Sequence, residues 1–185
     1  MKILSLHCDY IKFQAKKKAL KDAEKTTEKE VEVKEPLVIL TAVEKRDEKN
    51  IQEISDKLTK EIKDIAKQVN AKTIVLYPYA HLSSNLASPS KALEVLKETE
   101  KLLSKEFKVI RAPFGYYKSF ELKCKGHPLS ELSREISIEK EIEEKYNYEQ
   151  LLNEISKTRL DREKLKENDH RVLAQQMNLF SFSEV

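Results

Sequence analysis

The sequence is poor in the residues that mark membrane spans, secretion and glycine-rich loops. Its 185 residues include two glycines, two cysteines and no tryptophan. No apolar run approaches the roughly 18 residues that a membrane-spanning helix needs, so no membrane partner is predicted. The chain starts with Met-Lys and an alternating stretch, without a small-residue cleavage site, so no signal peptide is predicted. The length leaves room for one domain, or for one domain with an appendage, and we expect a cytoplasmic location.

Motifs for covalent or metal-assisted catalysis are also missing. There is no Gly-x-Ser-x-Gly element, no glycine-rich phosphate loop and no Cys-x-x-Cys pair. Cys8 and Cys124 are far apart in the sequence, and we expect both to be buried free thiols. The four histidines and two cysteines show no metal-ligand spacing, so no metal is predicted. Cys124 on an apolar strand is expected to be inert as a nucleophile.

Charge is abundant and unevenly distributed. Charged residues make up 36% of the chain, with a net charge of +3. Residues 1–136 hold 27 Lys/Arg against 21 Asp/Glu, whereas residues 137–185 hold 8 against 11. The first part is modestly basic, which is compatible with contact to RNA but weaker than a strong nucleic-acid footprint.

Apolar periodicity predicts a mixed α/β fold. The apolar residues of 51–69 recur every three or four positions, as in an amphipathic helix. Ser88 and Pro89 suit the cap and first turn of a second helix that runs to Leu103. The charged stretch 16–34 predicts a mobile loop, and residues 139–167 predict a charged helical linker. Strands are predicted at 2–7, 10–15, 36–43, 73–77, 107–110 and 116–122. Two long helices would then lie against a mixed β-sheet.

Two segments place polar side chains at the ends of predicted strands. Ala112–Lys118 reads Ala-Pro-Phe-Gly-Tyr-Tyr-Lys, and its Pro-x-Gly turn predicts a hairpin with tyrosines and a lysine at its mouth. Tyr77–Ser84 reads Tyr-Pro-Tyr-Ala-His-Leu-Ser-Ser and follows a buried strand. Ligands of α/β sheets tend to lie at the carboxyl ends of strands. From the residues alone, an ordinary hairpin and an ordinary loop also fit these segments.

Together with three further segments, these two resemble the amino-terminal editing domain of archaeal threonyl-tRNA synthetases, a relative of D-aminoacyl-tRNA deacylases. The further segments are Met1–Ile11, Ala42–Lys45 and Cys124–Arg134 (Cys-Lys-Gly-His-Pro-Leu-Ser-Glu-Leu-Ser-Arg), and all five occur in family order. The resemblance implies a deacylase-like α/β fold with a mixed sheet and two long helices.

The resemblance also divides the chain into three parts. It implies an editing domain at 1–136, followed by a charged helical linker at 137–167. Residues 168–173 and 178–182 are similar to the beginning of the synthetase catalytic domain, so 168–185 would be its truncated start. No cofactor is expected in this chain, because ATP, Mg and Zn would belong to the catalytic domain.

Four side chains are candidates for the chemistry. An imidazole such as His81 can orient water or act as a base, although a loop histidine that only bonds carbonyls looks the same in sequence. Lys118 can stabilise an oxyanion or contact the terminal adenosine phosphate, or merely guard a strand edge. Tyr117 can offer its hydroxyl or backbone to substrate, whereas Tyr116 alternates to the opposite face and is expected to pack. Glu131 can hold the substrate ammonium or face solvent.

By resemblance, His81, Tyr117, Lys118 and Glu131 correspond to pocket residues of the family. Val43, Pro78 and Ala80 are expected at the wall that meets the aminoacyl side chain, and from the residues alone Val43 and Ala80 also fit the core. The implied function is proofreading hydrolysis of L-seryl-tRNA(Thr), with help from the 2′-hydroxyl of the terminal adenosine. The implied partners are the acceptor end of tRNA(Thr), L-serine, a second copy of the chain and the catalytic domain in cis. A D-aminoacyl-tRNA deacylase and a non-catalytic tRNA-binding or dimerisation module are the alternatives.

Overall fold

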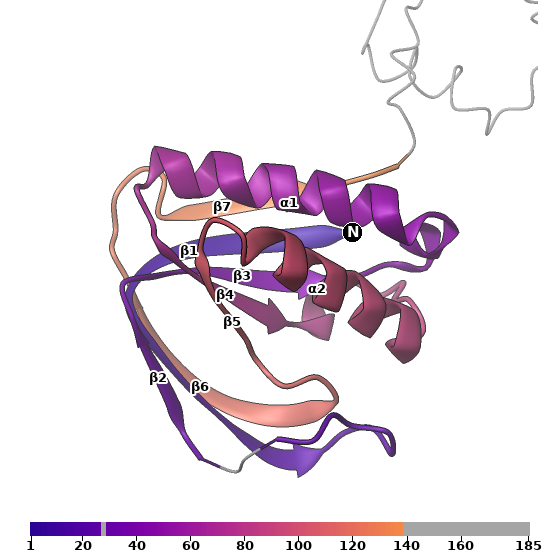
Figure 1. Ribbon diagram of the computed structural model, residues 1–185. Helices are drawn as coiled ribbons and strands as arrows, with labels where there is room; N and C mark the ends of the chain where they lie inside the picture. Colours follow the sequence, from indigo (N-terminus) through magenta and orange to yellow (C-terminus); the bar gives the residue numbers. More distant parts are fainter. Residues whose placement is uncertain (27–28, 139–185) are drawn as a thin grey trace, which may run out of the picture. The chain divides into compact units, whose positions relative to one another are not determined.

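The computed structural model describes residues 1–26 and 29–138 (Figure 1). They belong to a compact unit, Met1–Lys140, and a second unit, Glu141–Val185, lies outside the described residues. The predicted helical linker and the predicted start of a catalytic domain therefore fall outside the described part from residue 139 onward.

β1 (Lys2–Lys18) is the central strand of a seven-stranded mixed sheet. Its first half pairs antiparallel with β3 (Pro36–Ala42) on one side and with β7 (Glu131–Glu135) on the other. β4 (Thr73–Pro78) and β5 (Lys108–Arg111) continue the sheet in parallel beyond β3. We call these strands, with the first half of β1, the main wing. Every residue of β3 is buried, as expected for a strand covered on both faces.

The second half of β1 curves away and forms a second wing of the sheet (Figure 1). It pairs antiparallel with β2 (Val31–Lys34) and with β6 (Tyr116–Cys124). The register with β6 skips one residue after Cys8, which places a β-bulge at Asp9. The bulge exchanges the two faces of the strand, so that Cys8 before it and Ile11 after it enter the same core.

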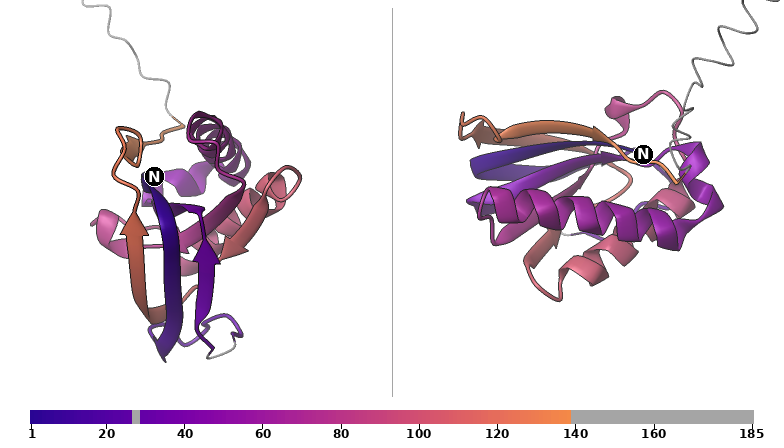
Figure 2. Two further views of the ribbon diagram at one scale, coloured as in Figure 1. Left: turned by 90° about the vertical axis from the view of Figure 1, so that its left-hand side faces the viewer. Right: turned by 90° about the horizontal axis from the view of Figure 1, so that it is seen from above.

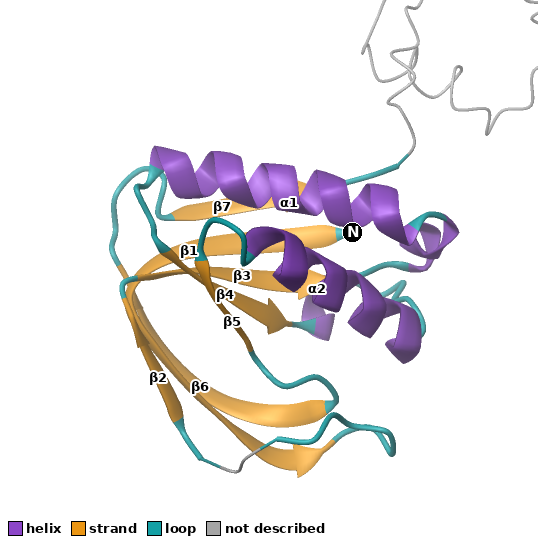
Figure 3. Ribbon diagram, in the orientation of Figure 1, coloured by secondary structure: helices purple, strands orange, loops and turns teal. Residues whose placement is uncertain are grey.

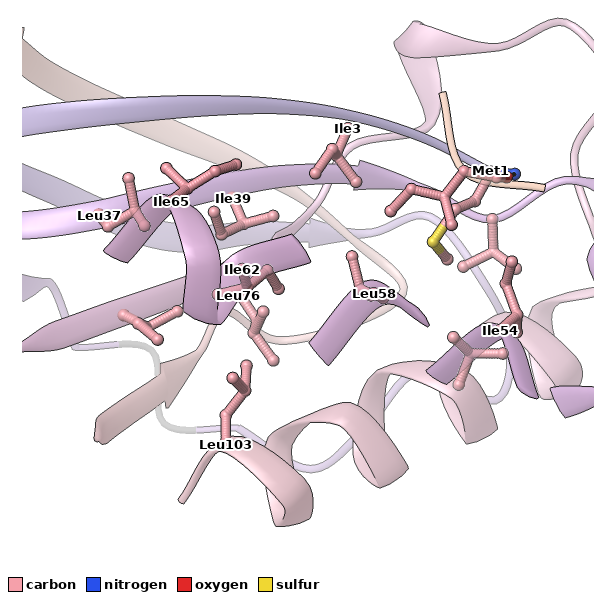
Figure 4. Packing of buried hydrophobic residues seen from close by; sticks show 14 of the residues in the cluster. Met1, Ile3, Leu37, Ile39, Ile54, Leu58, Ile62, Ile65, Leu76 and Leu103 are labelled. Atoms are coloured by element: carbon pink, nitrogen blue, oxygen red, sulfur yellow. Dashed lines mark hydrogen bonds between the residues drawn. The ribbon is translucent and has the colours of Figure 1, made fainter. Parts of the chain in front are cut away.

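Two helices cover one face of the main wing (Figures 2 and 3). α1 (Ile51–Gln68) begins at Asn50, whose side chain accepts a hydrogen bond from the backbone N–H of Glu53. α2 (Pro89–Leu103) begins with proline in its first turn, as predicted. The core between helices and sheet is built from aliphatic side chains, several of which are labelled in Figure 4: Met1, Ile3, Leu37, Ile39, Ile54, Leu58, Ile62, Ile65, Leu76 and Leu103.

A second core joins the two wings on the face away from the helices. The aromatic rings of Phe13 on β1 and Tyr77 on β4 meet edge to face, with ring centroids 5.8 Å apart. The buried members of this core are Cys8, Ile11, Phe13, Val33, Val38, Leu40, Val75, Tyr77 and Ala112. Burial of these side chains holds the second wing at a fixed angle to the main one.

A buried cluster of charge lies next to the end of β3. The Met1 ammonium donates to Asp47 Oδ1 at 2.9 Å and to the carbonyl of Ile136 at 2.7 Å, and Glu44 Oε2 lies 3.3 Å away. The Ser83 hydroxyl donates to Glu44 Oε1 at 2.6 Å. The cluster therefore ties the end of β3 to the loop that follows β4.

The mixed α/β fold with two long helices is confirmed, but four predictions differ. The strands at 107–110 and 116–122 were predicted to form a hairpin, but β5 pairs with β4 and β6 pairs with β1. Residues 2–7 and 10–15 were predicted as two strands and are one strand, interrupted only by the bulge. The prediction of a mobile loop at 16–34 is wrong at both ends, because β1 runs to Lys18 and β2 begins at Val31. β7 was not predicted, since it is a short and largely exposed edge strand with little apolar alternation.

Candidate active site

A cavity of about 530 Å³ opens between the two wings and the start of α2. Its size lies within the usual range for small-molecule sites. The wall comes from the carboxyl ends of β3 and β4, from α2, from the β5–β6 turn and from the segment after β1. The lining residues are Ala19, Leu20, Thr41, Ala42, Val43, Tyr77, Pro78, Tyr79, Ala80, His81, Leu86, Ala87, Pro89, Ala92, Leu96, Phe114, Gly115, Tyr116, Tyr117, Lys118 and Phe120.

The parallel strands β3 and β4 end side by side at this cavity, as expected for α/β sheets. The backbone N–H of Tyr79 donates to the carbonyl of Thr41 at 2.8 Å, which holds the chain after β4 against the end of β3. A single 3₁₀ turn, Ala80–Leu82, then presents His81 to solvent. The His81 ring meets the Tyr79 ring edge to face at 5.2 Å. Its imidazole is therefore exposed at the cavity and oriented by an aromatic neighbour.

Lys118 on β6 carries the positive charge of the cavity. Its Nζ donates to the carbonyls of Pro113 at 3.2 Å and Tyr116 at 3.3 Å, and lies 5.0 Å from the centre of the Tyr77 ring. Within residues 1–26 and 29–138, no carboxylate forms an ion pair with it. Burial without a counter-ion lowers the pKa of Lys118 to about 8. The site thus holds an ammonium that gains from any negative charge placed beside it.

The turn before β6 is anchored by the segment that follows β1. The backbone N–H groups of Ala19 and Leu20 both donate to the Gly115 carbonyl, at 2.8 and 3.2 Å. Gly115 has φ +83°, and a Cβ there would lie 3.0 Å from the Cα of Ala23, so the close approach requires glycine. The Arg111 guanidinium binds both carboxylate oxygens of Glu24, at 2.5 and 2.9 Å.

The same carboxylate joins this anchor to the turn. Glu24 Oε2 also accepts the N–H of Phe114 at 3.0 Å. The Arg111 contacts and this hydrogen bond hold the pKa of Glu24 below its ordinary value, even though burial alone would raise it. The Tyr116 hydroxyl donates to the Glu24 carbonyl at 2.8 Å. Tyr116 lines the cavity, so the expectation that it faces away from the site is wrong.

The structure brings together most of the residues singled out from the sequence. Val43, Pro78, Ala80, His81, Tyr117 and Lys118 all line the cavity. Tyr117 lies at the rim, where 63% of its surface is exposed. Glu131 does not line the cavity: it is exposed on β7, opposite Leu6 of β1.

Sequence reasoning missed two parts of the wall. Ala19 and Leu20 lie in a stretch whose charged composition indicated only a loop. Leu86 and Phe120 are apolar yet 44% and 43% exposed, and no periodicity distinguishes them from core positions. Among residues 1–26 and 29–138, no helix is both long and apolar enough to cross a membrane.

Threonine–tRNA ligases are among the proteins that this chain resembles in sequence. The threonine–tRNA ligase of Thermococcus onnurineus is 52% identical over 139 residues, which cover 74% of this chain and 22% of that relative. The threonine–tRNA ligase editing subunit of Saccharolobus solfataricus is 47% identical over 143 residues, which cover 77% of this chain and 36% of the relative. This chain therefore matches only about a fifth to a third of the length of these relatives.

A solved structure shares the fold alone. The c-Myc DNA Unwinding Element Binding Protein superimposes with a TM-score of 0.54 at 10% identity, covering 74% of this chain and 99% of that one. Residues 1–136 match the family described as the archaea-specific editing domain of threonyl-tRNA synthetase. That match includes every residue that lines the cavity, and the chain belongs to this family.

Proposed function

We propose that the cavity hydrolyses the aminoacyl ester of L-seryl-tRNA(Thr). The observation that carries the proposal is the Lys118 ammonium, which is partly buried at the cavity against carbonyls and a tyrosine ring with no carboxylate partner in the described residues. A charge in this setting interacts more strongly with an oxyanion than a fully exposed charge does, since less water competes with it.

In the proposed reaction, water attacks the carbonyl carbon of the ester and the carbonyl oxygen becomes an oxyanion. The bond between that carbon and the ribose oxygen then breaks, which releases serine and a tRNA with a free terminal hydroxyl. Lys118 stabilises the oxyanion, and His81 helps to position the water. The 2′-hydroxyl of the terminal adenosine assists the attack of this water, and no protein side chain acts as a nucleophile.

A second hydrolytic site is needed because serine differs from threonine by one methyl group. Such a difference changes binding by only about 1–3 kcal/mol, which is too little for faithful aminoacylation. Val43, Pro78 and Ala80 line the cavity and are proposed to meet the side chain of the amino acid. Glu131 was expected to hold the substrate ammonium, but it does not line the cavity, so no substrate contact is proposed for it.

The test is to mix the 185-residue chain with Ser-tRNA(Thr), Thr-tRNA(Thr) and a D-aminoacyl-tRNA, and to follow loss of each ester. Loss of serine with threonine spared supports editing. Loss of the D-aminoacyl ester alone would instead assign the chain to the D-aminoacyl-tRNA deacylases. If all three esters persist, the chain by itself is not a hydrolase.

The proposed partners follow from the same reading. In a complete synthetase the catalytic domain would lie in cis and would supply mischarged tRNA. We propose that two copies of the chain associate through sheet edges, and β7 offers an edge on the main wing. A light-scattering mass equal to one chain would contradict this dimer.

A further inference from the structure

We propose that Lys16, Lys17 and Lys18, at the end of β1, bind the phosphates of the single-stranded acceptor end and so guide the ester into the cavity. The inference rests on the proposed function for the identity of the substrate. It adds a binding surface outside the cavity, made by side chains that do not line it. We call these three residues the lysine strand end.

The lysine strand end lies directly at the cavity. Lys17 and Lys18 are register partners of Tyr117 and Tyr116 on β6, and both tyrosines line the cavity. The next two residues, Ala19 and Leu20, line it as well. A polynucleotide whose terminal ester enters the cavity therefore passes close to these lysines.

The position of the lysine strand end is fixed. The hydrogen bonds from Ala19 and Leu20 to Gly115 hold the chain immediately after it. The contacts of Glu24 with Arg111 and Phe114 fix the segment a few residues further on. Three ammonium groups are thus carried on an anchored strand end, which lowers the entropy cost of engaging a ligand.

Unlike many other lysines, these three have no carboxylate partner among the described residues. Lys63, Lys91, Lys101 and Lys125, for example, form ion pairs with glutamates within the chain. Among the described residues, by contrast, no carboxylate forms an ion pair with any member of the lysine strand end. Lys16 donates only to the neutral side chain of Gln14. All three side chains are exposed.

The chemistry of this surface fits phosphate rather than base recognition. An ammonium is a compact point charge that binds a phosphate without reading sequence. Each phosphate neutralised on a single strand releases counter-ions, so the logarithm of the binding constant falls with the logarithm of salt, by about 0.7 per contact. The lysine strand end is therefore expected to contribute affinity and salt dependence, and to leave the choice of amino acid unchanged.

The test compares two triple variants of the 185-residue chain. One is Lys16→Gln/Lys17→Gln/Lys18→Gln. The matched control is Lys60→Gln/Lys67→Gln/Lys105→Gln, which removes the same charge from exposed lysines that do not line the cavity. Circular dichroism and thermal melting establish that both variants are folded. The binding of tRNA(Thr) is measured by fluorescence anisotropy across a salt series, and hydrolysis is followed with Ser-tRNA(Thr) and with seryl-adenosine, which lacks the phosphates.

The lysine-strand-end variant is expected to bind tRNA about 10 to 100-fold more weakly at low salt, with a salt slope reduced by about 1.4 to 2.1. Its turnover of seryl-adenosine should stay within about twofold of wild type, and the control variant should match wild type throughout. Equal losses in both variants, or an unchanged salt slope, would overturn the proposal. If wild type hydrolyses neither substrate, the proposed function fails, while the binding series still decides whether this surface holds the acceptor end.

Discussion

At the scale of single residues, the Lys118 ammonium is expected both to stabilise the oxyanion and to lower the stability of the folded chain. Its ammonium is partly buried without a counter-ion, and its pKa is lowered to about 8. If the charged form stabilises the oxyanion, enzyme-dependent hydrolysis of Ser-tRNA(Thr) should fall as the pH rises through about 8, after subtraction of the uncatalysed rate. Lys118→Arg stays charged over this range and should lose the decline, even if its rate is lower. A wild-type rate that stays level up to pH 9.5 would show that the ammonium is not needed.

The same burial should destabilise the folded chain at neutral pH. Because the folded-state pKa of Lys118 lies below its ordinary value of 10.5, the penalty is fully present below about pH 8 and disappears as the pH rises toward 10.5. Lys118→Met should therefore stabilise the chain by about 1 kcal/mol at pH 7, less than the full shift because the side chain keeps contact with water. Urea denaturation at pH 7 and pH 10.5 measures the difference, which should shrink at the higher pH. A less stable Lys118→Met chain at pH 7 contradicts the expectation.

His81 gives a contrasting expectation, because it is exposed and touches only the Tyr79 ring among the contacts described. A histidine that helps to position water should contribute modestly, so His81→Ala should lower kcat about tenfold without abolishing turnover. General base catalysis typically contributes about 10² to 10⁴-fold. Single-turnover deacylation separates the two roles, and a loss at the upper end of that range with intact tRNA binding would make His81 the base.

At the scale of elements, pairing with β6 across the bulge determines which side chains of β1 face the second core. Deletion of Asp9 would remove the extra residue and leave Ile11 and Phe13 opposite Leu122 and Phe120, so both should still face the second core. The deletion should therefore cost much less unfolding free energy, measured by urea denaturation, than the about 3–6 kcal/mol expected if both side chains became exposed. Asp9→Ala keeps the bulge and loses only the exposed ion pairs with Lys123 and Lys125, so it should cost less than about 1 kcal/mol. A loss of about 3–6 kcal/mol on deletion would contradict the expectation, because it would mean that Ile11 and Phe13 had turned away from the second core.

At the scale of the whole molecule, the sequence was enough for the family, the α/β class and most of the cavity wall. The helix at 51–69 and the strand at 36–43 carry strong local patterns, so they were predictable within about two residues of their ends. What failed depends on pairing between distant segments. The charged residues at 16–18 form a strand only because β6 pairs with them. Asp47 lies in a charged stretch after β3, and its burial beside the Met1 ammonium has no local signal in the sequence.

Because β1 belongs to both wings, one strand connects the two sides of the cavity. Lys118 and Tyr117 are attached to its second half through β6, while Tyr77 and His81 are joined to its first half through β3 and β4. The distance between the two sides of the cavity is therefore set by the curvature of the β1 backbone. A substitution that changes this curvature would alter the width of the cavity, and with it the fit of the proposed aminoacyl ligand, without replacing any residue that lines the cavity.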